Sequence, residues 1–149
     1  MFRKVGLGLA AVLVAATLSG AGVAAEINKT FLGNAIEGYD PIAYHMQGMP
    51  VEGSSDFTHD WGGATWRFAS AEYRNLFASN PEKYAPGYGG YCAYGISQGY
   101  LVDIDPEAWS IVDGRLYLNV NKDIQKTWEA DIPGYLKLAD KKWPELTGE

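Results

Sequence analysis

Residues 56–95 of this 149-residue chain, DFTHDWGGATWRFASAEYRNLFASNPEKYAPGYGGYCAYG, decide the fold. On both sides of Gly62 and Gly63, apolar or aromatic residues alternate with polar ones. A two-residue glycine loop between alternating segments is typical of a tight β-hairpin, because glycine adopts positive φ without steric cost. The loop length fixes the expected cross-strand pairs, which are Trp61 with Ala64, His59 with Trp66 and Phe57 with Phe68.

A short helix and a glycine-rich loop follow this hairpin. Ser70 is a favourable N-cap, and the spacing of apolar residues predicts a helix over residues 71–79. Asn80-Pro81 ends this helix and begins one further turn. The loop GYGG then leads to Cys92, the only cysteine of the chain. Periodicity does not decide whether residues 91–96 form a strand or a loop that enters a helix.

The rest of the chain carries signals for one more hairpin and three helices. They are a helix begun by Asp40-Pro41, a hairpin with strands 109–112 and 115–120, a helix capped by Asn121, and a last helix after Ile132 that Trp143-Pro144 ends. We therefore predict an α+β fold: a small antiparallel sheet built from two hairpins, with three to four short helices packed on it.

The first 25 residues have the pattern of a secretory signal peptide. Arg3 and Lys4 precede an apolar run over residues 5–18, and the small residues Val23-Ala24-Ala25 follow. The run is too short to cross the hydrocarbon core of a bilayer, which argues against a permanent anchor. We predict cleavage before Glu26, a single domain over residues 26–149, a periplasmic or secreted location, and no stable membrane anchor after cleavage.

The charge of the predicted mature chain excludes one class of partner. Removing Arg3 and Lys4 from the 12 basic residues leaves 10 against 18 acidic ones, so the net charge is −8. An acidic surface without basic clusters repels phosphate backbones. Nucleic acid is therefore not expected to bind.

Cys92 and His59 are the main candidates for chemistry. A single cysteine forms no internal disulfide, so Cys92 is a metal ligand, a redox centre or a buried apolar residue. The predicted hairpin directs His59 onto the aromatic face, where its nitrogens need partners. A core histidine that bonds to the backbone is the alternative. We expect Cys92 and His59 to share a pocket, with Tyr39, Asp40, Tyr91 and Tyr94 around them.

This inventory favours a soft metal ion over zinc. A structural zinc site takes four nitrogen or sulfur ligands, and the chain offers three at most. Copper(I), bound by Cys92 and His59, is the primary hypothesis. Two alternatives stay open. In one, Cys92 is the nucleophile of a thiol redox enzyme that uses an external thiol. In the other, the protein is a non-catalytic interaction module and Cys92 is simply buried.

Several motifs resemble the exported YHS-domain (seleno)protein family. They are GYDPIAYH, FTHDWGGATWRFAS with the following AEYRNLFASNPEKYAP, GGYCAYGIS and NKDIQKTWEADIPG. The resemblance implies a small metal-binding module of the type attached to copper and heavy-metal transport ATPases. It also implies a metal ion and another exported or membrane metal-handling protein as partners.

Of the functional positions of the YHS family, the resemblance assigns only one to this chain, namely Cys92. The archetypal YHS module has cysteines where this chain has Ala43, Ala69 and Tyr73, so its thiolate ligands are not transferred. Relatives in the exported branch are often labelled (seleno)proteins, which implies that selenocysteine can stand at the position of Cys92. That implies a reactive or metal-facing chalcogen rather than a packing residue.

Overall fold

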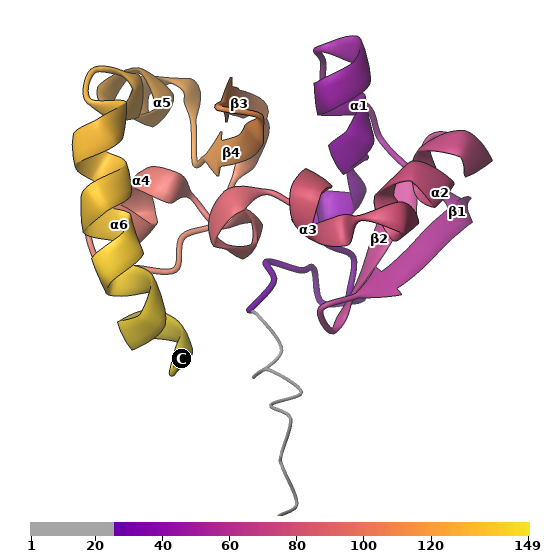
Figure 1. Cartoon of the computed structure of the whole chain (residues 1–149), viewed down its shortest axis with the longest axis horizontal. Coiled ribbons are helices and arrows are strands. Elements are labelled where there is room, and N and C mark those ends of the chain that lie inside the picture. The colour runs from indigo at the N-terminus through magenta and orange to yellow at the C-terminus, as the bar shows by residue number, and fades with distance from the viewer. Residues whose placement is uncertain (1–25) are drawn as a thin grey trace, which may run out of the picture.

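The computed structural model describes residues 26–149 and has the predicted α+β class. The predicted signal peptide over residues 1–25 lies outside the described residues. The β3–β4 hairpin lies toward the middle of the molecule, the β1–β2 hairpin lies with α1 and α2 at one end, and α5 and α6 lie at the other (Figure 1).

The first half of the described chain contains one hairpin and its helices. In order, they are η1 (Ile36–Gly38), α1 (Pro41–Gln47), β1 (Ser54–Trp61), β2 (Ala64–Phe68), α2 (Ala71–Ser79) and α3 (Pro81–Tyr84). The second half has η2 (Gly87–Gly90), α4 (Ala93–Ser97), β3 (Asp105–Val112), β4 (Arg115–Asn119), α5 (Lys122–Glu129) and α6 (Ile132–Thr147).

The register of the first hairpin is confirmed next to its turn. Trp61 pairs with Ala64 and His59 pairs with Trp66. The predicted pair of Phe57 with Phe68 is wrong, because a β-bulge between Ser54 and Thr58 shifts the register and places Ser54 opposite Phe68. The extra residues of a bulge have no partner across the ladder, so alternation close to the turn does not extend beyond it.

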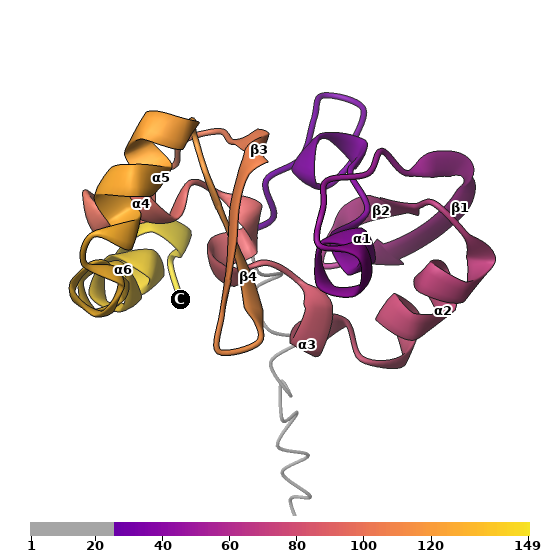
Figure 2. The same cartoon turned by 90° about the horizontal axis from the view of Figure 1, so that it is seen from above.

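The two hairpins do not form one sheet, which corrects the sequence prediction. β1 pairs only with β2, and β3 pairs only with β4. Figure 2 shows the hairpins apart, with α3 between them. Each two-stranded sheet is too small to be stable alone, so its stability depends on the helices that cover it.

Local capping signals place most helices as predicted. The Ser70 side chain accepts a hydrogen bond from the Tyr73 N–H, and Asn121 accepts one from the Ile124 N–H. The last helix is an exception, because it continues through Pro144 to Thr147. Proline near a helix end removes one backbone hydrogen bond without necessarily stopping the helix. Gly148, in the left-handed conformation, ends it instead.

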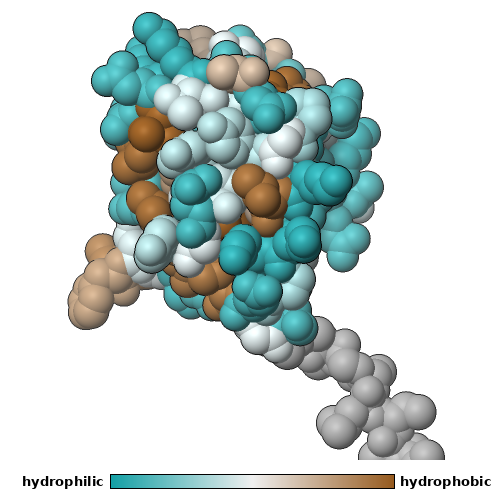
Figure 3. Space-filling view, turned by 90° about the vertical axis from the view of Figure 1, so that its left-hand side faces the viewer, coloured by the Kyte–Doolittle hydropathy of each residue, from teal (hydrophilic) through white to brown (hydrophobic). Residues whose placement is uncertain are grey.

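One apolar core joins both halves of the described chain. Trp66, Phe68 and Phe77 from the first half pack in the same cluster as Leu116 and Leu118 from β4. In Figure 3, apolar groups on the face that carries α5 and α6 alternate with polar ones instead of forming a continuous band. Within residues 26–149, no helix is both long and apolar enough to cross a membrane.

Candidate functional site

Cys92 lies between the glycine-rich loop η2 and α4, beside strand β4. It is the N-cap residue of α4, forms an isolated parallel bridge with Leu118, and donates its backbone N–H to the Val102 carbonyl at 2.9 Å. Residues 91–96, undecided from the sequence, are therefore a bridge that leads directly into a helix. Only 1 % of Cys92 is exposed. Backbone bonds on both sides fix the position of its thiol.

The sulfur of Cys92 accepts one hydrogen bond and donates another. The Gly95 N–H donates to Cys92 Sγ at 3.4 Å, and the thiol donates to Asn119 Oδ1 at 3.5 Å. Burial raises the pKa of the Cys92 thiol, while hydrogen bonds from the backbone N–H groups of Gly95, Val120 and Tyr94 act in the opposite direction. The resting group is thus a neutral thiol next to donors that favour negative charge on sulfur.

Asn119 carries an unsatisfied donor beside this thiol. It is fully buried, and its Oδ1 accepts the Tyr94 N–H at 3.1 Å as well as the thiol. Its Nδ2 has no hydrogen-bond partner within residues 26–149. A buried donor without a partner costs about 1–3 kcal/mol, which a ligand that accepts a hydrogen bond would recover.

An apolar pocket of about 400 Å³ adjoins the sulfur. Its walls come from α4, the loop after it, the end of β4 and α5, and they consist of Cys92, Tyr94, Gly95, Gln98, Tyr100, Val102, Val120 and Ile124. Small-molecule sites have this size and this mainly apolar lining with a few polar groups. We call this hollow the Cys92 pocket.

His59 does not line the Cys92 pocket, so the expected shared pocket is corrected. The hairpin directs His59 as predicted, but α2 covers that face: its ring packs edge-on against Phe77, with centroids 6.1 Å apart. In Figures 1 and 2, β1 and α4 lie toward opposite ends of the molecule. A single ion held by both Cys92 and His59 is not supported by this arrangement.

Two of the four predicted neighbours are adjacent to Cys92. Tyr94 lines the pocket, and its ring packs against Tyr135 with centroids 5.3 Å apart. Tyr91 precedes Cys92, but its hydroxyl donates to Glu26 Oε1 at 3.1 Å. Burial and this bond raise the pKa of Tyr91 to about 12. Of the two, Tyr94 alone reaches the pocket.

Tyr39 and Asp40 serve the first half of the chain instead. Tyr39 forms an isolated bridge with Glu52. Asp40 is fully buried, and its carboxylate accepts the N–H groups of Ile42, Ala43 and Ala69 at 2.8, 3.2 and 2.8 Å. All of these bonds are structural, because they start α1 and tie it to the end of β2.

The groups that hydrogen-bond to the Cys92 sulfur, the Gly95 N–H and Asn119 Oδ1, are not soft ligands of the type that copper(I) prefers. Backbone N–H groups stabilise an anionic sulfur, but they have no lone pair to give a cation. Within residues 26–149, no group of three or more histidine, cysteine, aspartate or glutamate side chains is arranged to hold a metal. Copper binding by this chain stays a prediction from its sequence.

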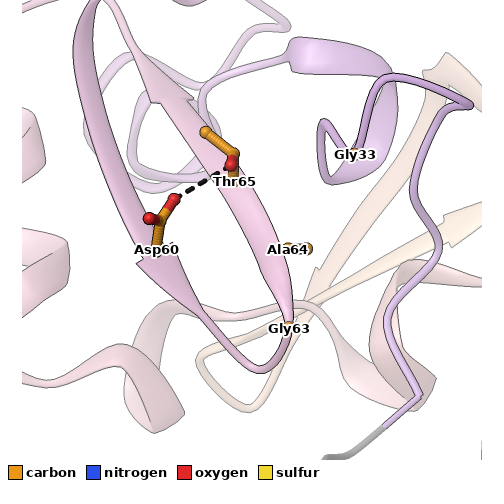
Figure 4. A pocket seen from close by; sticks show the side chains of 5 residues that line it. All are labelled: Gly33, Asp60, Gly63, Ala64 and Thr65. Atoms are coloured by element: carbon orange, nitrogen blue, oxygen red, sulfur yellow. Dashed lines mark hydrogen bonds between the residues drawn. The ribbon is translucent and has the colours of Figure 1, made fainter.

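A second hollow of about 310 Å³ lies beside the first hairpin and offers less chemistry. Gly33, Asp60, Gly63, Ala64 and Thr65 line it (Figure 4). The Thr65 hydroxyl donates to Asp60 Oδ1 at 2.9 Å, so the side chains that carry polar groups bond to each other. This hollow contains no nucleophile and no cluster of titratable groups.

Asn119 is the functional candidate that sequence reasoning missed. The one available signal was an amide residue within the apolar alternation of residues 115–120. A polar residue in a core-facing position requires a partner, and here the partner is a thiol 27 positions earlier in the chain. Nothing in the sequence alone joins these two positions.

In comparisons with known protein families, with curated proteins and with solved structures, no match was found for this chain. The candidate site therefore rests on geometry alone.

Proposed function

We propose that this protein is an exported single-thiol redox enzyme that reduces hydroperoxides of small apolar molecules, with Cys92 as the nucleophile. One observation carries the proposal: a buried thiol that accepts the Gly95 N–H, beside the unpartnered Nδ2 of Asn119, lines an apolar pocket of about 400 Å³. The pocket would bind the apolar part of the substrate, and the donors would stabilise charge that develops on sulfur and oxygen.

The reaction balances with one thiol and an external reductant. Cys92 sulfur attacks the terminal oxygen of ROOH, the O–O bond breaks, and the thiol proton goes to the leaving oxygen, giving Cys–SOH and ROH. An external thiol condenses with the sulfenic acid to a mixed disulfide and water. A second thiol releases Cys92 as the free thiol and leaves with the first as a disulfide.

Asn119 is a positioning residue in this scheme. Its Oδ1 holds the resting thiol at 3.5 Å. Its unpartnered Nδ2 would donate to the peroxide or to the sulfenic acid oxygen, which restores a hydrogen bond lost on folding. A side chain of similar size without an amide, such as leucine, removes both functions.

Access to Cys92 selects small substrates over proteins. The thiol is 1 % exposed, so a disulfide on the surface of another protein does not reach it without local opening. This argues against a role as a protein disulfide oxidoreductase. The motifs that resemble exported YHS-domain (seleno)proteins imply that selenocysteine can stand at this position, and a reactive chalcogen agrees with that implication. That family assignment stays a prediction.

The proposal is tested by trapping the sulfenic acid. The purified protein is treated with cumene hydroperoxide in the presence of dimedone, and the intact mass is measured. We expect one dimedone adduct on Cys92, none in Cys92→Ser, and slower formation in Asn119→Leu. No adduct in the wild-type protein, with the thiol labelled only after denaturation, would instead support an interaction module in which Cys92 is merely buried.

A copper titration runs alongside and tests the primary sequence hypothesis. Copper(I) is titrated against a competing chelator with the wild-type protein, Cys92→Ser and His59→Ala. We expect His59→Ala to bind like the wild-type protein, because His59 packs on Phe77 and does not line the Cys92 pocket. Equal loss of affinity in both variants would overturn the proposal and restore the shared metal site.

A further inference from the structure

A cleft separate from the Cys92 pocket surrounds η2 and is lined by residues of α6, the start of β4 and the end of β1. Two adjoining hollows of about 340 and 230 Å³ form it. Both are lined by Tyr88, Arg115 and Trp143, so the cleft is continuous. The larger hollow also includes Trp61 and Glu82, while the smaller includes Tyr117 and Asp140. We call the whole the aromatic cleft. None of its residues lines the Cys92 pocket.

Tyr88 is held firmly at the centre of the aromatic cleft. Its backbone has φ of 55°, which is unusual for a residue other than glycine. Its hydroxyl donates to Asp140 Oδ1 at 2.8 Å. Its ring lies 5.9 Å from the ring of Trp143 and 5.9 Å from that of Tyr117, centroid to centroid. These partly exposed rings form a fixed aromatic wall.

Charged side chains of both signs border this wall. Arg115, Glu82 and Asp140 are exposed at the rim. Within residues 26–149, the side chains of Arg115 and Glu82 make no hydrogen bond and no ion pair, and Asp140 uses only Oδ1. Each hollow is thus lined by guanidinium donors and by a carboxylate acceptor.

We propose that the aromatic cleft binds an oligosaccharide, with one sugar ring in each hollow. The C–H face of a pyranose is apolar and packs on aromatic rings, and its hydroxyl groups both donate and accept hydrogen bonds. Sugar hydroxyls can therefore accept hydrogen bonds from Arg115 and donate hydrogen bonds to Glu82 or Asp140. Guanidinium and carboxylate groups bond to paired hydroxyls in a bidentate manner.

Other ligand classes match this set of groups less well. An anionic ligand that binds Arg115 meets Glu82 and Asp140, which repel it, and a cation meets Arg115. A proline-rich peptide also packs on aromatic grooves, but its backbone offers carbonyl acceptors and few N–H donors. Such a peptide would leave both carboxylates without a donor. The mixture of charges favours a ligand rich in hydroxyls.

The test is a titration of the full chain by tryptophan fluorescence and calorimetry, since Trp61 and Trp143 line the cleft. The probes are glucose, cellobiose, N-acetylglucosamine and N,N′-diacetylchitobiose. We expect saturable binding of at least one disaccharide, at least about tenfold tighter than its monosaccharide, because the second ring fills the second hollow. Arg115→Ala should weaken this binding about tenfold or more, because hydrogen bonds to a charged group are lost.

A matched control and a second variant keep the proposal open to refutation. Arg74→Ala removes a half-buried arginine that lies over Phe57, outside the cleft, and should bind as the wild-type protein does. Trp143→Ala should abolish binding, with circular dichroism to check its folding. No saturable signal for any saccharide up to about 50 mM would overturn the proposal. Binding of a proline-rich peptide in place of saccharides, or equal saccharide affinity in Arg115→Ala, would also overturn it.

Discussion

Replacing Asp40 by alanine should cost much more stability than replacing any other helix cap. The carboxylate accepts three N–H groups, two at the start of α1 and one from Ala69 at the end of β2. Loss of an N-cap costs about 1 kcal/mol, and a partly buried N–H without a partner costs about 1–3 kcal/mol. The structure therefore predicts a total of about 2–4 kcal/mol.

The lower end of this range is the expected value for Asp40→Ala. Burial raises the pKa of the Asp40 carboxylic acid, so the charged form is costly to bury and its removal recovers part of the loss. Asp40→Asn keeps one oxygen acceptor for α1 without the buried charge. We expect losses of about 2 kcal/mol for alanine and about 1 kcal/mol for asparagine.

Urea unfolding followed by tryptophan fluorescence measures these differences. The matched control is Asp131→Ala, which removes the exposed N-cap of α6 with its single bond to the Gly134 N–H. We expect that control to lose about 1 kcal/mol or less. If Asp40→Ala loses no more than Asp131→Ala, the bond between α1 and β2 does not contribute as described.

Three further predictions concern the glycines, the thiol and the histidine. Gly89→Ala should lower the free energy of unfolding by more than about 2 kcal/mol, because φ is +62° and the new Cβ would clash with the Glu26 carbonyl. In Gly114→Ala the new Cβ meets open space, so the loss should be about 1 kcal/mol. Thermal unfolding of both variants measures the difference. Burial raises the pKa of the Cys92 thiol in the folded protein above the value of about 8.5 in the unfolded chain. The thiol therefore contributes its full stabilisation below about pH 8.5, and this stabilisation is lost as the pH rises through the pKa of the folded state. Urea unfolding between about pH 8 and pH 10 should therefore show a steeper decline for the wild-type protein than for Cys92→Ala. His59→Ala should leave the rate of Cys92 oxidation unchanged, and a change of more than about twofold in that rate would mean that the two residues are coupled.

Local signals predicted most elements of this fold, and non-local packing explains the errors. The Gly62-Gly63 loop, the Asp40 cap and the Ser70 cap each act over a few residues, and each lies where the sequence indicates. The separation of the two hairpins into two sheets accompanies contacts between elements far apart in the chain, such as those of α1 and α3 with β4. No pattern within either hairpin contains that information.

For the candidate site, too, local sequence signals were correct and contacts between distant segments were missed. The sequence identified Cys92 and the face on which His59 lies, but the element that covers His59 is α2 and not the cysteine segment. Asn119 and Val120, which complete the surroundings of the thiol, come from the end of β4. Proximity of this type arises only when the chain folds.

The rates at which cumene hydroperoxide and hydrogen peroxide oxidise Cys92 test the central claim most directly. Hydrogen peroxide is smaller and reaches a buried thiol more easily, so only binding in the Cys92 pocket favours the bulkier, apolar peroxide. The second-order rate constants are measured under identical conditions by trapping the sulfenic acid. We predict that cumene hydroperoxide reacts at least about tenfold faster. An equal or faster reaction with hydrogen peroxide would contradict the account.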